Sequence, residues 1–297
     1  MTAAFSFGLV LLVFLMVFVI WRQAEPSIQK FGWSFIFSDQ WGPVREEFGA
    51  LPYIFGTVVS TFLAILFAGP VSMGTAIYLA EFAPRRIKTQ FAFVVDLLAS
   101  IPSIVYGLWG SFVLAPFLRG YVEPWLDNNL GFLPFFQGPP FGLGMLAAGI
   151  ILAIMSIPVI TAVTREVLQT VPAGQREPLI ALGATPWEIV RVGVVPYARD
   201  GIIGAFTLGL GKAIGETVAV TMVIGNEPKI SASLFSPAHS MTSVIVNEFA
   251  QAVKFLHLSA LIHIGLILFG LTLLVNILAR LLIYQMSWRI KKRNGYN

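Results

Sequence analysis

Lys212 and Glu216 are the two charged residues within the stretch 201–225, which is otherwise uncharged. Residues four apart share one face of a helix, so an ion pair between them is within reach. If the stretch spans a membrane, each charge at its centre costs at least about 2.5–3.5 kcal/mol on insertion scales, and both side chains should face protein or water. They are either a neutralised packing pair or a gate on a substrate path. We favour the path, because two apolar residues would pack without the desolvation cost.

Two nucleotide-binding patterns begin in the same stretch, and both are incomplete. Gly211-Lys212 resembles the end of a P-loop, but Phe206 occupies the first glycine position and Ala213 stands where Ser or Thr is required. The dinucleotide-binding pattern fails at Ile214, which occupies its third glycine position. The chain is therefore expected to have no nucleotide site of its own and to be no enzyme.

The remaining side chains also give no indication of catalysis or of a cofactor. The sequence has no cysteine, which excludes disulfides and thiolate metal ligands. The three histidines lack the spacing of a metal-ligand set, and we expect them at the membrane interface: His239, His257 and His263. We expect no catalytic residue, no metal and no cofactor bound by this chain.

Composition places the chain among integral membrane proteins. It has 297 residues, of which 57% are hydrophobic and 11% charged, whereas a soluble domain carries roughly 25% charged residues. A spanning helix needs about 20 apolar residues, and six stretches are long enough. An all-α membrane protein with six transmembrane helices is therefore predicted, with spans at 3–21, 51–80, 89–118, 142–164, 201–225 and 256–284.

The basic residues predict the orientation of these spans. One set of connections carries eleven Lys and Arg residues and the other carries six, and the richer set faces the cytoplasm. Both termini are then cytoplasmic. We expect three parts: a first helix with an outer interfacial segment at 1–50, a five-helix core at 51–285, and a basic cytoplasmic tail at 286–297. A net charge of +4 follows from this topology, and no nucleic-acid partner is expected.

The longest inner connection, residues 165–200, contains strong local signals. A short helix is expected over 176–182, followed by Gly183, a residue type that commonly ends helices in the left-handed conformation. A new helix then begins with Thr185 as its N-cap and Pro186 in the first helical position. Glu188, three residues after the cap, completes a capping box. Pro196 is expected to limit this helix. The result is a rigid knob, which either leads back into the next helix or docks a soluble partner.

The knob carries a pattern that resembles a known family. Glu177, Gly183 and the closing Val195-Pro196 have the spacing of the "EAA" loop of ABC-importer permeases. The chain departs from that pattern in the two Ala positions and in the positions of its Ile and Leu: Pro178, Leu179, Gly193 and Val195. The resemblance implies that this loop inserts into the ATPase subunit, and the expected coupling residues are Glu177, Gly183, Ala184, Thr185, Pro186, Trp187 and Glu188.

Further segments resemble the phosphate-importer permeases, with the last two closer to the PstC type than to PstA. The similarity extends over roughly residues 30–285 and is most specific in the segment of Lys212 and Glu216. It implies a type I ABC importer permease fold. The segments that carry it are 48–52, 101–109, 209–217, 222–226 and 244–250.

The resemblance gives the charged pair a substrate. Phosphate carries one to two negative charges at pH 7, so its path needs a compensating cation. We hypothesise that Lys212 alternates between Glu216 and the passing anion, with Thr217 beside them. The family more often has Arg at position 212, and Lys gives a point charge instead of a bidentate fork.

Three further residues are candidates for the same path. Asp96 lies about seven residues into the third apolar stretch, at ~10 Å depth with 1.5 Å per residue. It lies at the interface, pairs with an inner-loop Arg, or joins an inner vestibule below Ser100 and Ser103, whose hydroxyls would donate to phosphate. Pro102 is expected to kink the helix there.

The family resemblance implies several partners and one location. The expected partners are a second permease subunit of the PstA type, a dimer of ATPase subunits that binds ATP and Mg, a phosphate-binding protein on the outer face, and the lipid bilayer. The expected location is the bacterial cytoplasmic (inner) membrane. Alternatives are a permease for another oxyanion such as sulfate or molybdate, an ATP-independent transporter or channel, and a chiefly regulatory subunit.

Overall fold

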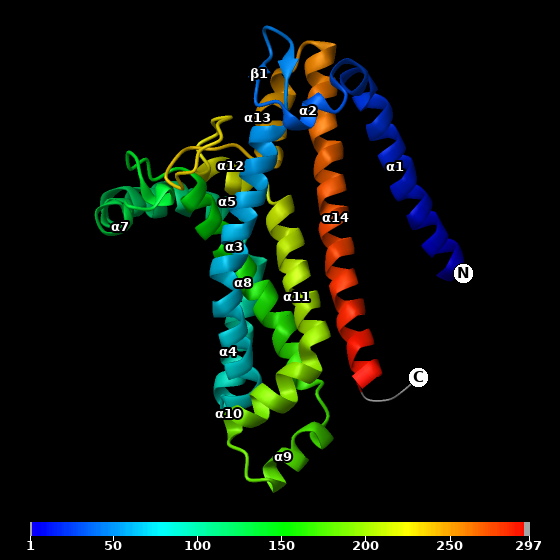
Figure 1. Ribbon diagram of the computed structural model, residues 1–297, viewed down its shortest axis with the longest axis vertical. Coiled ribbons are helices and arrows are strands. Elements are labelled where there is room, and N and C mark those ends of the chain that lie inside the picture. Colours follow the sequence, from blue (N-terminus) through cyan, green and yellow to red (C-terminus); the bar gives the residue numbers. More distant parts are fainter. Residues whose placement is uncertain (1, 294–297) are drawn as a thin grey trace. The chain divides into compact units, whose positions relative to one another are not determined.

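The computed structural model describes residues 2–293 and is helical along most of its length (Figure 1). The longer helices are α1 (Thr2–Phe31), α3 (Leu51–Ile77), α4 (Arg85–Ser100), α8 (Met145–Gln169), α11 (Val195–Gly215) and α14 (Phe255–Arg293). The shorter ones are α2 (Ser34–Phe37), α5 (Ser103–Trp109), α6 (Ala115–Phe117), α7 (Glu123–Leu130), α9 (Glu177–Ala181), α10 (Pro186–Glu188), α12 (Val218–Val223) and α13 (Met241–Glu248). One antiparallel hairpin pairs β1 (Trp41–Gly42) with β2 (Glu47–Phe48).

Four π-helical segments and three 3-10 turns connect these helices. The π-helical segments are η1 (Tyr78–Phe82), η2 (Gly110–Leu114), η3 (Leu118–Val122) and η6 (Ile189–Val194). The 3-10 turns are η4 (Pro134–Phe136), η5 (Ala173–Gln175) and η7 (Phe249–Gln251).

The chain folds into two compact units whose segments alternate along the sequence. Unit 1 comprises 1–60, 107–148 and 217–272, and unit 2 comprises 61–106, 149–216 and 273–297. The division does not follow the predicted boundaries at residues 50 and 285, which remain predictions. The predicted basic tail at 286–297 lies outside the residues whose side chains the structure describes.

Four helices in the described residues are long and apolar enough to cross a membrane by themselves, and the predicted count of six spans stays a prediction. The four helices are Phe5–Phe31, Leu51–Phe82, Met145–Gln169 and Phe255–Gln285. A bent pair, Arg86–Ser100 with Ser103–Leu130, makes a fifth if it counts as one span. The bend confirms the kink expected at Pro102. Ile101 is extended there, with φ −64° and ψ 128°, as a residue before proline favours.

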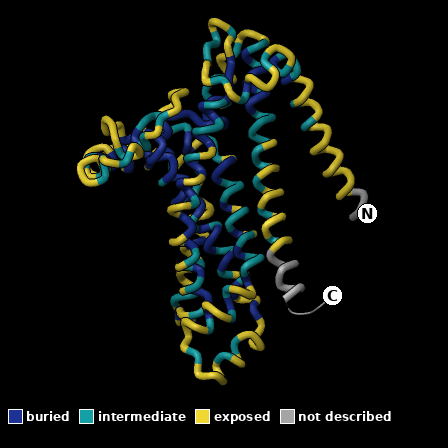
Figure 2. Tube along the Cα trace, viewed as in Figure 1, coloured by how far each residue is buried: buried dark blue, intermediate teal, exposed yellow. Residues whose placement is uncertain are grey.

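The first helix runs ten residues past its predicted end at residue 21. Glu25 holds the added turns, because it accepts hydrogen bonds from Arg22 (3.3 Å) and from Gln29 (3.1 Å) on one helix face. No residue in the most apolar part of α1 is buried within the chain, whereas 67% of the residues in the most apolar part of α8 are buried. Figure 2 shows the exposed residues along α1.

The segment that follows α1 is partly a packed core and does not lie wholly at the surface as predicted. Phe35 and Phe48 are buried with Tyr53 in the core of unit 1, and Trp41 packs against them. Trp33 and Phe37 of the same segment are 80% and 71% exposed. The predicted interfacial segment therefore uses most of these aromatic rings to hold α2 and the hairpin against the start of α3.

The core of unit 2 lies where α3, α8 and α11 pack together. One cluster contains Ala76, Ala80, Leu168, Val171, Val194, Ala198 and Ile202. A second contains Ala68, Ala153 and Ile160, with Phe206 packed against both. Small residues allow the close approach of α8 to its neighbours: a Cβ on Gly209 would lie 2.5 Å from Ile160. This core positions Lys212 and the knob.

Candidate functional site

Lys212 lies in the last turn of α11 and reaches α8. Its Nζ atom donates to the backbone carbonyl oxygen of Met155 across 3.3 Å. Pro158 lies inside α8, three residues further on. A proline lacks the N–H that would donate to the carbonyl four residues earlier, here that of Ile154, so Lys212 donates to the carbonyl next to this gap. Ser72 donates to another carbonyl oxygen of α8, that of Ile157, across 3.3 Å.

Glu216 does not lie in the middle of a helix, and this corrects the sequence prediction. The helix ends at Gly215, and Glu216 is extended, with φ −69° and ψ 129°. Thr217 then precedes α12, and its carbonyl oxygen accepts hydrogen bonds from the amide and the hydroxyl of Thr221 (3.0 and 2.7 Å). Three glycines in the last seven residues of α11 weaken its end. The pairing of Lys212 with Glu216 stays a prediction.

The helix break between α11 and α12 coincides with the boundary of the two compact units. Lys212 and Glu216 belong to unit 2, and Thr217 begins a segment of unit 1. The predicted span 201–225 is therefore two helices, α11 and α12, and neither is among the helices long and apolar enough to cross a membrane by itself.

The other predicted path residues surround the bend between α4 and α5 in unit 2. Asp96 and Ser100 are exposed and Ser103 is half-buried. The Ser100 hydroxyl donates to the carbonyl oxygen of Leu97 across 2.7 Å. Asp96 makes no ion pair within the described residues. No hydrogen bond of the described part joins these three residues to Lys212, so their place on the path stays a prediction.

The knob at 165–200 has the local structure that the sequence predicts. α9 covers Glu177–Ala181, and Gly183 follows in the left-handed region at φ +78°. The Thr185 hydroxyl accepts from the Glu188 amide (3.4 Å), and the Glu188 carboxylate accepts from the Thr185 amide (2.7 Å). This is the predicted capping box. The hydrogen bond from the Thr185 amide lowers the pKa of the exposed Glu188 carboxylate, which keeps it charged.

Pro196 does not end the helix that begins at Pro186, contrary to the prediction. The backbone continues through the π-helical turn η6 into α11, where Pro196 occupies one of the first two positions. A π-helical turn inserts an extra residue, and a proline at the start of a helix needs no donor. The knob is therefore continuous with the helix that carries Lys212.

Apolar side chains project from the knob. Leu182 is 83% exposed, and Ile180 and Trp187 are 58% and 54% exposed. Grouped exposed apolar residues indicate a protein-contact surface when they lie on a polar loop. We call Ile180, Leu182 and Trp187 the knob surface.

Arg176 and Glu81 form an ion pair that the sequence analysis did not identify. The Arg176 Nη2 atom lies 2.8 Å from Glu81 Oε1. The sequence shows the two residues only separately: Glu81 follows the apolar stretch 51–80, and Arg176 lies in the connection after the stretch 142–164. Because 95 residues separate the two, no local pattern joins them.

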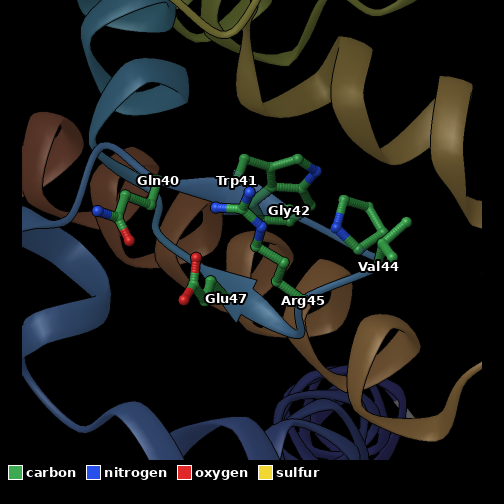
Figure 3. Close-up of a pocket in the computed structure, with 7 residues that line it drawn as sticks. Gln40, Trp41, Gly42, Val44, Arg45 and Glu47 are labelled. Carbon is green, nitrogen blue, oxygen red and sulfur yellow. The ribbon is translucent and has the colours of Figure 1, made fainter.

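The β1–β2 hairpin borders an open cavity of about 430 Å³ (Figure 3). It is lined by Gln40, Trp41, Gly42, Pro43, Val44, Arg45 and Glu47. Glu46 fixes the turn, at φ +57°, through ion pairs with Lys254 (3.2 Å) and Lys30 (3.7 Å). The hydrogen bond and charge of Lys254 lower the pKa of the Glu46 carboxyl.

The three histidines are buried within unit 1, and their predicted place at the membrane interface stays a prediction. His239 bonds Ser243 (2.6 Å), His257 bonds Glu248 (2.8 Å) and His263 bonds Ser27 (3.1 Å). The described residues contain no group of three His, Cys, Asp or Glu side chains that could hold a metal ion. Their roles in the fold are hydrogen bonding and ring stacking, such as that of His263 on Phe35 at 4.2 Å.

The apolar helices, the half-buried lysine and the capped knob define a multi-pass membrane permease. The chain belongs to the family of binding-protein-dependent transport system inner membrane components, whose profile matches residues 72–287.

Among curated proteins, the chain is similar to permease proteins of phosphate transport systems. The phosphate transport system permease protein PstC of Mesorhizobium japonicum is 47% identical over 91% of this chain and 82% of its own. That of Haemophilus influenzae is 46% identical over 88% of this chain and 84% of its own. The probable PstC of Methanocaldococcus jannaschii is 36% identical over 90% and 85%.

Among solved structures, the chain is similar to one from the MetNI methionine ABC transporter in inward-facing conformations. The TM-score is 0.54 at 20% identity, with 78% of this chain and 91% of that chain covered. At this identity the likeness shows the fold alone.

Proposed function

We propose that this chain is the permease subunit of an ATP-driven importer of inorganic phosphate. The observation that carries the proposal is the similarity to PstC proteins, which reaches 47% identity and covers most of both chains. The helix-terminal Lys212, hydrogen-bonded inside unit 2, supplies the positive charge that an anion path needs.

In the proposed mechanism the chain forms half of the translocation path. Lys212 donates to the Met155 carbonyl, which is a neutral acceptor. A phosphate oxygen is a stronger, charged acceptor, so an arriving anion draws Lys212 away from α8. Return to Met155, or engagement by Glu216, releases the anion. Such exchange favours throughput over tight binding, as alternating access requires.

The knob couples the path to ATP hydrolysis in this proposal. The knob surface docks on an ATPase subunit, two of which bind ATP and Mg, and the helix from Pro186 to Gly215 transmits the movement to Lys212. A second permease subunit of the PstA type completes the path. A phosphate-binding protein delivers the anion at the outer face, near the hairpin cavity.

The proposed location is the bacterial inner membrane, with six spans of type I importer topology and both termini in the cytoplasm. Lys and Arg in the connections support this orientation, because cytoplasmic connections are the richer in these residues. The apolar helices of the described residues support a multi-pass protein.

Reconstitution tests the proposal. The chain, a PstA-type partner and the ATPase are co-expressed, purified together and placed in lipid vesicles with the phosphate-binding protein. Uptake of radiolabelled phosphate that requires ATP and resists competition by sulfate and molybdate is the expected result. Uptake without ATP would support a channel or secondary transporter, and inhibition by sulfate or molybdate would support another oxyanion; either result contradicts the proposal.

A further inference from the structure

We propose that Arg176 and Glu81 form a clasp that couples the knob to α3, and that both are positioning residues for ATP-driven transport. The inference rests on the proposed function. The clasp joins the guanidinium and carboxylate across 2.8 Å, and the two side chains are only 25% and 15% exposed. Solvent therefore screens this pair much less than an ion pair on the surface.

Arg176 binds two helix ends at once. Besides Glu81, its guanidinium donates to the carbonyl oxygens of Leu168 (3.3 Å) and Val171. Leu168 lies in the last turn of α8 and Val171 lies two residues beyond its end, a place where the last helical carbonyl groups lack intrahelical donors and the helix dipole favours a cation. Arg176 also directly precedes α9. One side chain thus links the start of the knob to the ends of α3 and α8.

The chemistry of arginine suits this position better than that of lysine. A guanidinium presents five donors in a rigid planar fork, whereas an ammonium is a compact point charge. The three acceptors of Arg176 come from a carboxylate and two separate backbone groups. Binding all of them fixes the orientation of the side chain as well as its charge.

Glu81 lies on a segment that is itself firmly packed. It belongs to the π-helical turn η1 at the end of α3, a type of turn that is frequent at functional sites. The neighbouring Ala80 is buried in the cluster that also contains Leu168 and Val194. Packed interiors have low compressibility and transmit strain. A displacement of α9 is therefore passed through the clasp to α3 instead of being absorbed by the loop.

The test compares phosphate uptake with ATP hydrolysis in the reconstituted complex. Glu81→Ala and Arg176→Gln are expected to lower the phosphate imported per ATP hydrolysed by about tenfold, within the range of typical coupling free energies. Hydrolysis itself should continue. Glu81→Asp, which keeps the carboxylate, should retain most of the coupling. Glu25→Ala is the matched control, because it removes an exposed ion pair of α1 with side chains 64% and 41% exposed.

An unchanged ratio in Glu81→Ala would overturn the proposal, and so would a parallel loss of uptake and hydrolysis, which indicates a merely structural pair. Arg176→Lys is the second variant if Arg176→Gln does not assemble. It keeps the charge and loses the fork, so an intermediate ratio is expected and a ratio equal to that of the parent contradicts the clasp. A parent complex without ATP-dependent phosphate uptake would refute the proposed function instead.

Discussion

The Nζ atom of Lys212 donates to the carbonyl oxygen of Met155 in the turn of α8 that precedes Pro158. The lysine belongs to α11 and the carbonyl to α8, and 57 residues separate them. A neutral carbonyl holds an ammonium less strongly than a carboxylate does. The contact therefore keeps the lysine in place and leaves it available to an anion.

Removal of the charge at position 212 should impair transport. Lys212→Gln is expected to lower the initial rate of ATP-dependent phosphate uptake by at least about tenfold, because a hydrogen bond to a charged group is worth about 1.5–3 kcal/mol. Lys212→Arg, with the residue more frequent in the family, is the control and should keep most of the rate. Glu216→Gln should also slow uptake. Normal transport in both Gln variants would exclude the charged pair from the path.

Leu182 should be required for binding of the ATPase. Leu182 is 83% exposed. The substitution Leu182→Ser therefore leaves the chain's own core intact but removes an apolar contact of the knob surface. Loss of an interface hot spot costs at least about 2 kcal/mol, so co-purification of the ATPase should fall more than tenfold. Val253→Ser is the matched control, since Val253 is 96% exposed and lies outside the knob. Equal ATPase recovery from both variants would argue against docking at this surface.

Acidification should destabilise the protein through His239. Burial lowers the pKa of His239 to about 4, below its unfolded value near 6.5. Between these values the unfolded chain binds more protons than the folded one, so stability falls as the pH falls. The loss should reach about 2 kcal/mol at pH 5.

The thermal unfolding of the detergent-purified chain at pH 7.5 and pH 5 measures this effect. A His239→Gln variant, which cannot titrate there, should show a smaller difference between the two pH values. A difference as large as that of the parent would assign the acid sensitivity to other groups.

The turn and the capping box of the knob could be predicted from the sequence. The left-handed Gly183 and the Thr185–Glu188 capping box form as expected, because each depends on residues within three positions of one another. The bend before Pro102 follows for the same reason. The path of the helix past Pro196 could not be predicted, because the π-helical turn η6 is stabilised by its packing against α3 and α8.

Composition alone does not predict where a long apolar stretch is broken into separate helices. Apolar length identified α3, α8 and α14, whose mean hydropathy is high. It did not identify the break at Glu216, because hydropathy is insensitive to the glycines that weaken the end of α11. The sequence analysis also predicted an interfacial segment after the first helix, whereas Phe35 and Phe48 of this segment are buried against residues of α3 and α14.

By itself, the sequence determined the class of this protein, its helical character and the capped knob, since these follow from composition and short-range spacing. Only the tertiary structure decided the acceptor of Lys212 and the partner of Arg176. Both contacts join residues that are distant in the chain, and each exists because neighbouring helices bring a backbone carbonyl or a carboxylate within reach of a cation. A charge in a poorly solvated site takes the nearest acceptor, and the packing of α3, α8 and α11 determines which acceptor that is.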